Sequence, residues 1–152
     1  MNDTIRQLLA AYPVISSYPV LWSDLDIAMH VNNTRYIRWS ECGRVDYQLA
    51  IDPASLFAAD RSYAPVLASI TCDFLRSVFF PDTIHIGTRV AEIADDRFVM
   101  ENLMVSEKQE RPVAQARGVL VLVDIQTGRK ISLPADYVAT VEAFEASRLH
   151  TD

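Results

Sequence analysis

The sequence predicts an α+β domain in which one long helix packs against an antiparallel sheet. Residues 33–50 have the period of a helix, whereas from residue 62 onward apolar and polar residues alternate with the period of a strand. Short polar turns separate three long strand-like runs, which is typical of strands that follow one another in an antiparallel meander. The order of strand, helix and strands predicts that the helix covers one face of the sheet.

The first two elements are short. Residues 3–11 predict a helix that Asp3 caps. Residues 18–24 predict a strand with Val20 and Trp22 on the same face.

Residues 33–50 predict the central helix. Polar residues recur at spacings of three and four and form a stripe, in which we expect Glu41 to pair with Arg44. Two small residues, Ser40 and Gly43, lie in the middle of the opposite, apolar face. A glycine inside a helix costs about 1 kcal/mol relative to alanine. We infer that the helix backbone is pressed closely against the sheet at Gly43.

The remaining elements follow from the change of period. Strands are expected from residue 62 to 75, over 83–93, over 97–107 and over 112–125. Pro134 can open a last helix. The run 112–125 is apolar on both faces, which predicts a contact with a second copy of the chain and therefore a homodimer or homotetramer.

Composition limits the function. The 152 residues fit one domain over 1–152, and their net charge of −6 disfavours nucleic acid and anionic membranes as partners. No apolar run approaches the ~20 residues of a membrane span. The two cysteines, Cys42 and Cys72, form no CxxC motif, so we expect a reduced, cytoplasmic protein without a metal or other cofactor.

The polar residues gather in one segment, 23–36, between the first strand and the long helix. One interpretation is a loop that caps the helix, with Asn33 as the cap. The other interpretation is catalytic. A helix N-terminus presents unpaired N–H groups that can hold a carbonyl oxygen as it gains negative charge. A carboxylate on the preceding loop can then attack that carbonyl or activate water.

These residues also carry a family resemblance. The segment contains D-x-D at Asp24 and Asp26, then H-V-N-N-x-x-Y over 30–36, then W-x-E-x-G-R over 39–44. This arrangement resembles the hot-dog-fold acyl-CoA thioesterases of the 4-hydroxybenzoyl-CoA thioesterase type. The runs 73–76 and 80–83 are similar to the second-strand region of that family and to the turn after it. The resemblance implies a hot-dog fold, in which a curved antiparallel sheet wraps around one long central helix, and dimers with active sites at the interface.

The resemblance also implies roles for individual residues. Asp26 becomes the catalytic carboxylate, and the backbone N–H at Asn33 polarises the thioester carbonyl. His30, Asn32 and Tyr36 line or brace the site, while Asp24 braces the loop. The chain departs from the family pattern at Met29 and Pro81, where many relatives have glycine.

Arg76 is predicted on different grounds. The CoA nucleotide carries several negative charges, and only Lys108 and Lys130 are lysines, so arginine is the expected phosphate partner. Arg76 lies near the end of the second predicted strand, and we expect it to bind the CoA phosphates.

Three functions follow from this pattern. The first is hydrolysis of an acyl-CoA thioester to a free acid and CoA, with Asp26 as nucleophile or general base. The second is a hot-dog hydratase or dehydratase acting on acyl-CoA or acyl-carrier protein, although the D-x-N-P-x-H arrangement of such enzymes is missing. The third is a non-catalytic acyl-CoA-binding module. The sequence leaves open the acyl chain and the choice between CoA and acyl-carrier-protein thioesters.

Overall fold

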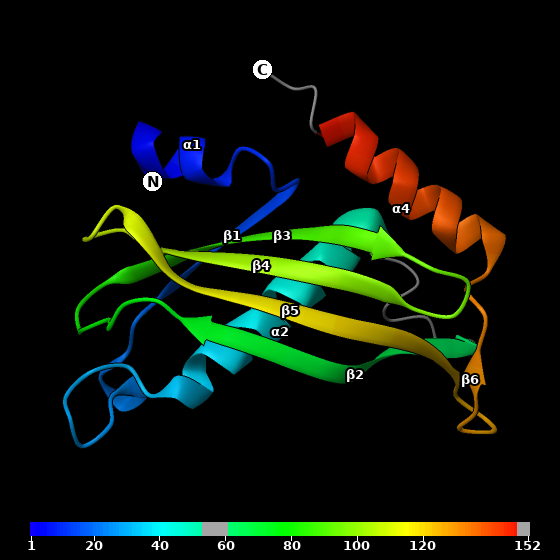
Figure 1. Ribbon diagram of the computed structural model, residues 1–152, viewed down its shortest axis with the longest axis horizontal. Helices are drawn as coiled ribbons and strands as arrows, with labels where there is room; N and C mark the ends of the chain where they lie inside the picture. Colours follow the sequence, from blue (N-terminus) through cyan, green and yellow to red (C-terminus); the bar gives the residue numbers. More distant parts are fainter. Residues whose placement is uncertain (53–60, 149–152) are drawn as a thin grey trace.

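The computed structural model describes residues 1–52 and 61–148. One antiparallel sheet, in the order β1-β3-β4-β5-β2, spreads across one side of the long helix α2 (Figure 1). These strands are β1 (Val14–Pro19), β2 (Tyr63–Phe74), β3 (Thr83–Ile93), β4 (Phe98–Ser106) and β5 (Arg111–Asp124), and the short β6 (Lys130–Ile131) pairs with β5. The helices are α1 (Asp3–Leu9), α2 (Asn33–Ile51) and α4 (Ala135–Arg148). The predicted α+β fold is therefore confirmed, with each of the four long strands at or near its expected bounds.

None of the helices within residues 1–52 and 61–148 combines the length and the apolar character that crossing a bilayer requires.

Helix α2 is pressed against the sheet at its small residues, as predicted. Gly43 is buried, and a Cβ atom added to it would lie only 2.5 Å from Thr88 Oγ1 and 2.9 Å from Asn102 Nδ2. Asn102 donates to Thr88 Oγ1 over 2.8 Å and accepts from Ser40 Oγ over 2.6 Å. A buried polar chain thus links the helix to β3 and β4, and glycine at position 43 is a steric requirement of that contact.

The predicted polar stripe of α2 is wrong at Arg44. This residue is only 8% exposed, and its guanidinium donates to Ser40 Oγ over 2.7 Å. Glu41 pairs with Arg38 instead of Arg44. The reason is the curvature of the sheet. It covers the apolar face of α2 and also part of the polar stripe, including Arg44.

The N-terminal predictions need three corrections. Asn2, not Asp3, caps α1, because its side chain accepts from the Ile5 N–H. The first strand is Val14–Pro19, which pairs with β3, and residues 22–24 form a single 3₁₀ turn instead of a strand. Val20 and Trp22 do not share a face, since Val20 is buried and Trp22 is 64% exposed.

The core has two main parts along α2. The first surrounds Tyr36 and Trp39 near the start of the helix, and the second surrounds Tyr47 near its end. Helix α4 closes the second part with Tyr137 and Phe144. The start of α2 is thereby fixed against the sheet, and this positions the loop that precedes the helix.

Candidate active site

The loop before α2 folds back on itself and carries the D-x-D motif. Leu25 and Val31 form an isolated antiparallel bridge, and the Asp26 N–H donates to the His30 carbonyl over 3.0 Å. The Asp26 carboxylate accepts from the Ala28 N–H over 2.8 Å through Oδ1. One carboxylate oxygen is therefore held by the loop backbone, and the other, Oδ2, lies on the side of His30.

The tip of this loop requires a left-handed backbone conformation. Met29 has φ of 61°, in the region that favours glycine. For a residue with a side chain, this conformation costs roughly 1–2 kcal/mol. Met29 therefore forms the turn that a glycine would form, and it adds local backbone strain next to the site.

Asp24 braces the loop from inside, as predicted. Its carboxylate is 3% exposed, accepts from the Leu21 N–H over 2.8 Å, and lies 2.8 Å from Arg35 Nε. Its carbonyl also accepts from the Asn32 N–H over 2.8 Å. This carboxylate is occupied on both sides, which leaves Asp26 as the motif's carboxylate with access to a ligand.

The first turn of α2 supplies the N–H groups of the site. Asn32, not Asn33, is the cap: its side chain accepts from the N–H and hydroxyl of Thr34 over 2.9 and 2.8 Å. The prediction that Asn33 caps the helix is therefore wrong. Across residues 1–52 and 61–148 we find no acceptor for the Asn33 N–H, which is the first of the helix. A ligand oxygen can take that place.

Five of the six predicted site residues meet at one cavity of about 370 Å³. Asp26, His30, Asn33, Tyr36 and Arg76 all line it. Asn32 does not line it and acts on the site only through its cap. The remaining lining residues were not predicted from the sequence: Val31, Phe74, Leu75 and Ser77. Leu75 and Ser77 flank Arg76 in the chain, which is the signal that would have found them.

The charges in this cavity are arranged around Asp26. His30 Nδ1 lies 3.4 Å from Asp26 Oδ2, so a protonated His30 would stabilise the carboxylate. Burial raises the pKa of Tyr36 to about 12, which keeps its hydroxyl neutral and able to donate a hydrogen bond at neutral pH. Arg76 is exposed, and its Nη1 donates to the Pro112 carbonyl over 2.7 Å, which leaves other N–H groups of the guanidinium for an anion.

Exposed apolar side chains surround the cavity. Phe74 and Phe79 are each about half exposed, and Ile27 is fully exposed. Phe74 packs edge-on against Tyr36, and Phe79 packs edge-on against His30. These side chains form an apolar rim that offers an apolar chain or a second protein surface a contact next to Asp26.

No three His, Cys, Asp or Glu side chains come together as a metal site within the described ranges 1–52 and 61–148.

Comparisons with known proteins agree with this architecture. The family model described as "Thioesterase-like superfamily" matches residues 20–141, which include the loop, α2 and the whole meander. The long-chain acyl-CoA thioesterase FadM of Escherichia coli K12 is 24% identical over 112 residues, covering 74% of this chain and 84% of FadM.

Solved structures show the same fold. A thioesterase of Thermus thermophilus, solved with coenzyme A and zinc, has a TM-score of 0.75 and 27% identity, with 90% of this chain and 97% of that chain covered. A DHNA-CoA thioesterase of Staphylococcus aureus has a TM-score of 0.77 at 17% identity, with 87% and 90% covered.

A curved antiparallel sheet around one helix, together with the family match over residues 20–141, defines a hot-dog-fold enzyme that hydrolyses thioesters. The chain belongs to the Thioesterase-like superfamily.

Proposed function

We propose that this protein hydrolyses acyl-CoA thioesters to a free acid and CoA, with Asp26 as the catalytic carboxylate. One observation carries the proposal: Asp26 and Asn33 line the same cavity, and the Asn33 N–H has no acceptor among residues 1–52 and 61–148. A nucleophile or base and an N–H donor are the two groups that thioester hydrolysis needs. The curated and structural relatives named as acyl-CoA or CoA thioesterases supply the substrate class.

The chemistry divides into two steps if Asp26 is the nucleophile. The carboxylate oxygen attacks the thioester carbon, the Asn33 N–H stabilises the oxyanion, and the C–S bond breaks to release CoA thiolate. Water then hydrolyses the mixed anhydride. If Asp26 is a general base, it takes a proton from water, which attacks the same carbon directly. Thiolate leaves without prior protonation, so neither route requires a strong general acid.

The surroundings of Asp26 fit these roles. His30 Nδ1 lies 3.4 Å from the carboxylate, and Tyr36 forms part of the wall of the same cavity. Arg76 is the residue we assign to the CoA phosphates, because it lines the cavity and its side chain is exposed.

We also propose that the protein is at least a dimer. Two surfaces support this: the apolar rim of the cavity, and the face of β5 that points away from α2, where Val119, Val121 and Val123 are only partly buried. Among residues 1–52 and 61–148, strand β2 is at the edge of the sheet and pairs only with β5. A second copy would cover such surfaces.

The test is thiol release from a panel of acyl-CoA substrates by the wild type and by Asp26→Asn. We expect hydrolysis of medium-chain or aromatic acyl-CoA by the wild type. Asp26→Asn should lose turnover while keeping its circular dichroism spectrum and its sedimentation coefficient. Near-normal turnover by the variant would remove Asp26 from the mechanism.

The same assay separates the other functions. A hydratase or dehydratase would change the absorbance of an enoyl-CoA without releasing thiol. A binding module would bind acyl-CoA and release nothing. Cleavage of acyl-carrier-protein thioesters alone would keep the role of Asp26 and exclude CoA as the carrier.

A further inference from the structure

The first turn of helix α2 carries an arginine, Arg35, that the proposed reaction does not use. Its Nε lies 2.8 Å from Oδ1 of the buried Asp24 carboxylate. The guanidinium also lies over the Trp39 ring, with Cζ 5.8 Å from the ring centre, so a buried residue one turn later helps to hold it in place. Among residues 1–52 and 61–148, no other cation lies within 4 Å of the Asp24 carboxylate. Arg35 therefore ties the buried carboxylate of the D-x-D motif to the helix.

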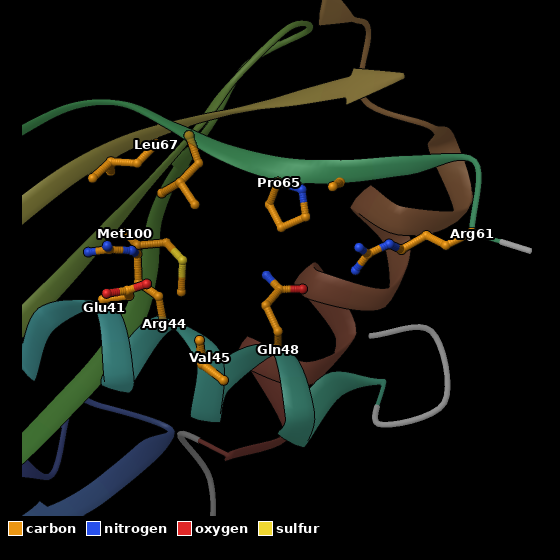
Figure 2. A pocket seen from close by; sticks show the side chains of 10 residues that line it. Glu41, Arg44, Val45, Gln48, Arg61, Pro65, Leu67 and Met100 are labelled. Carbon is orange, nitrogen blue, oxygen red and sulfur yellow. The ribbon is translucent and has the colours of Figure 1, made fainter. Parts of the chain in front are cut away.

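The other arginines of α2 have different surroundings. Arg44, on a later turn, lines a second cavity of about 270 Å³ between the helix and β2 (Figure 2). Arg38 is exposed and pairs with the exposed Glu41. Arg35 lines neither this second cavity nor the one at Asp26. It therefore does not form the wall of either space that a ligand would fill, and its contacts with Asp24 point to a role in holding the loop.

Asp24 joins three segments at this point. One carboxylate oxygen, Oδ2, accepts from the Leu21 N–H over 2.8 Å, and the other faces Arg35. The Asp24 carbonyl accepts from the Asn32 N–H over 2.8 Å. Asn32 in turn caps α2, since its side chain accepts from the Thr34 N–H and its carbonyl accepts from the Arg35 N–H. These contacts close a ring that runs from the D-x-D motif through the cap to Arg35 and back.

The two groups that are proposed to act on the thioester lie next to this ring. Asp26 follows Asp24 by two residues, and Asn33 directly follows Asn32. The Asp26 carboxylate accepts from the Ala28 N–H, which belongs to the same loop and moves with it. The separation between this carboxylate and the Asn33 N–H therefore depends on how the loop is attached to the helix. A displacement of about 1 Å between reacting groups can lower a rate by about 100-fold.

We propose that Arg35 is a positioning residue, which holds the Asp26 carboxylate and the Asn33 N–H at the separation that thioester hydrolysis requires. It acts through Asp24 and touches neither the substrate nor the reacting atoms. A neutral side chain at position 35 would leave Asp24 buried without its cation, so the loop would shift to bring this carboxylate toward water. The inference rests on the proposed function, because the reaction defines which separation is productive.

Steady-state thiol release by Arg35→Met, Arg35→Lys and Arg38→Met tests this role. Arg35→Met should lower kcat by roughly 10–100-fold and leave KM little changed, because Arg35 does not contact the substrate. The loss should be smaller than for Asp26→Asn, since the Val31 N–H still ties the loop to the Val78 carbonyl. Arg35→Lys, which keeps a cation at this position, should recover part of kcat. Arg38→Met removes the same charge from the exposed pair one turn later and should keep the kcat of wild type.

A double variant shows whether Arg35 acts through Asp24. If it does, Asp24→Asn/Arg35→Met should lose no more kcat than Arg35→Met alone, whereas independent losses would multiply. Urea denaturation establishes that each variant is folded at the assay temperature. If Arg35→Met is unfolded there, Arg35→Lys carries the same comparison with a smaller expected loss of kcat.

Hydrogen exchange of backbone amides, measured by NMR without substrate, separates this inference from the proposed function. The Leu21 and Asn32 N–H groups should exchange faster in Arg35→Met than in wild type, by roughly tenfold or more, and at the wild-type rate in Arg38→Met. Equal exchange in Arg35→Met, an unchanged kcat, multiplied losses in the double variant, or a rise in KM at constant kcat would each overturn the proposal. Absence of thiol release by wild type would refute the proposed function, and the exchange rates would still decide whether Arg35 holds the loop.

Discussion

Replacing Gly43 by alanine sets two physical effects against each other. In an exposed helix the change would stabilise the protein by about 1 kcal/mol, because alanine is the better helix former. In this protein the new Cβ would lie 2.5 Å from Thr88 Oγ1 and 2.9 Å from Asn102 Nδ2, distances that require one of the elements to move.

The magnitude follows from what has to move. Thr88 and Asn102 are buried and hydrogen-bonded to each other, so separating them leaves polar groups without partners at a cost of about 1–3 kcal/mol. Overpacking adds about 1–3 kcal/mol. After subtracting the gain in helix propensity, we expect Gly43→Ala to lower the free energy of unfolding by about 1–5 kcal/mol. In a protein of this size that lowers Tm by roughly 2–20 °C.

Urea denaturation followed by circular dichroism measures this change. Thr88→Ala is the matched control, because it removes the atom that the new methyl group meets. The double variant Gly43→Ala/Thr88→Ala should be less destabilised than the sum of the two single variants. An increase in stability for Gly43→Ala alone would refute the close contact between α2 and the sheet.

Four further predictions concern the loop, the buried histidine and the substrate. Asp24→Asn should cost about 2 kcal/mol in urea denaturation and change kcat much less than Asp26→Asn does, because Asp24 braces the loop from a buried position. Met29→Gly should raise stability by about 1 kcal/mol, since glycine adopts φ of 61° without strain; a loss of stability would contradict the strain. Burial lowers the pKa of His85 below its usual 6.5, so below about pH 6.5 the unfolded chain binds more protons than the folded protein, and the free energy of unfolding should fall as the pH drops. His85→Gln should make the free energy of unfolding less dependent on pH, as measured by urea denaturation at several pH values. KM for acyl-CoA should rise with salt in steady-state assays, because local arginines and not the net charge of −6 attract the nucleotide; a salt-independent KM would argue against this.

Elements whose pattern is local could be predicted from the amino-acid sequence. The period of 3.6 residues over 33–50 and the alternation after residue 62 depend on which residues are apolar, and the structure has a helix at Asn33–Ile51 and strands at these places. The same holds for the glycine at position 43, whose cost inside a helix already indicated a close contact.

Other features depend on partners far away in the chain. The first strand is Val14–Pro19 because those residues pair with β3, which lies much later in the chain, and no local pattern records that register. Arg44 belongs to the polar stripe by spacing, yet the curved sheet buries it. Asn32 rather than Asn33 caps the helix because a cap is defined by backbone angles, which the loop's closure at Leu25 and Val31 sets.

The candidate site shows both contributions. Asp26, His30 and Asn33 are neighbours in the chain, so their motif could be read directly. Arg76 and Phe74 join them only because β2 ends beside the start of α2. Local sequence thus sets the type of each element and its polar groups, whereas burial shared between distant segments decides which of those groups meet in a cavity.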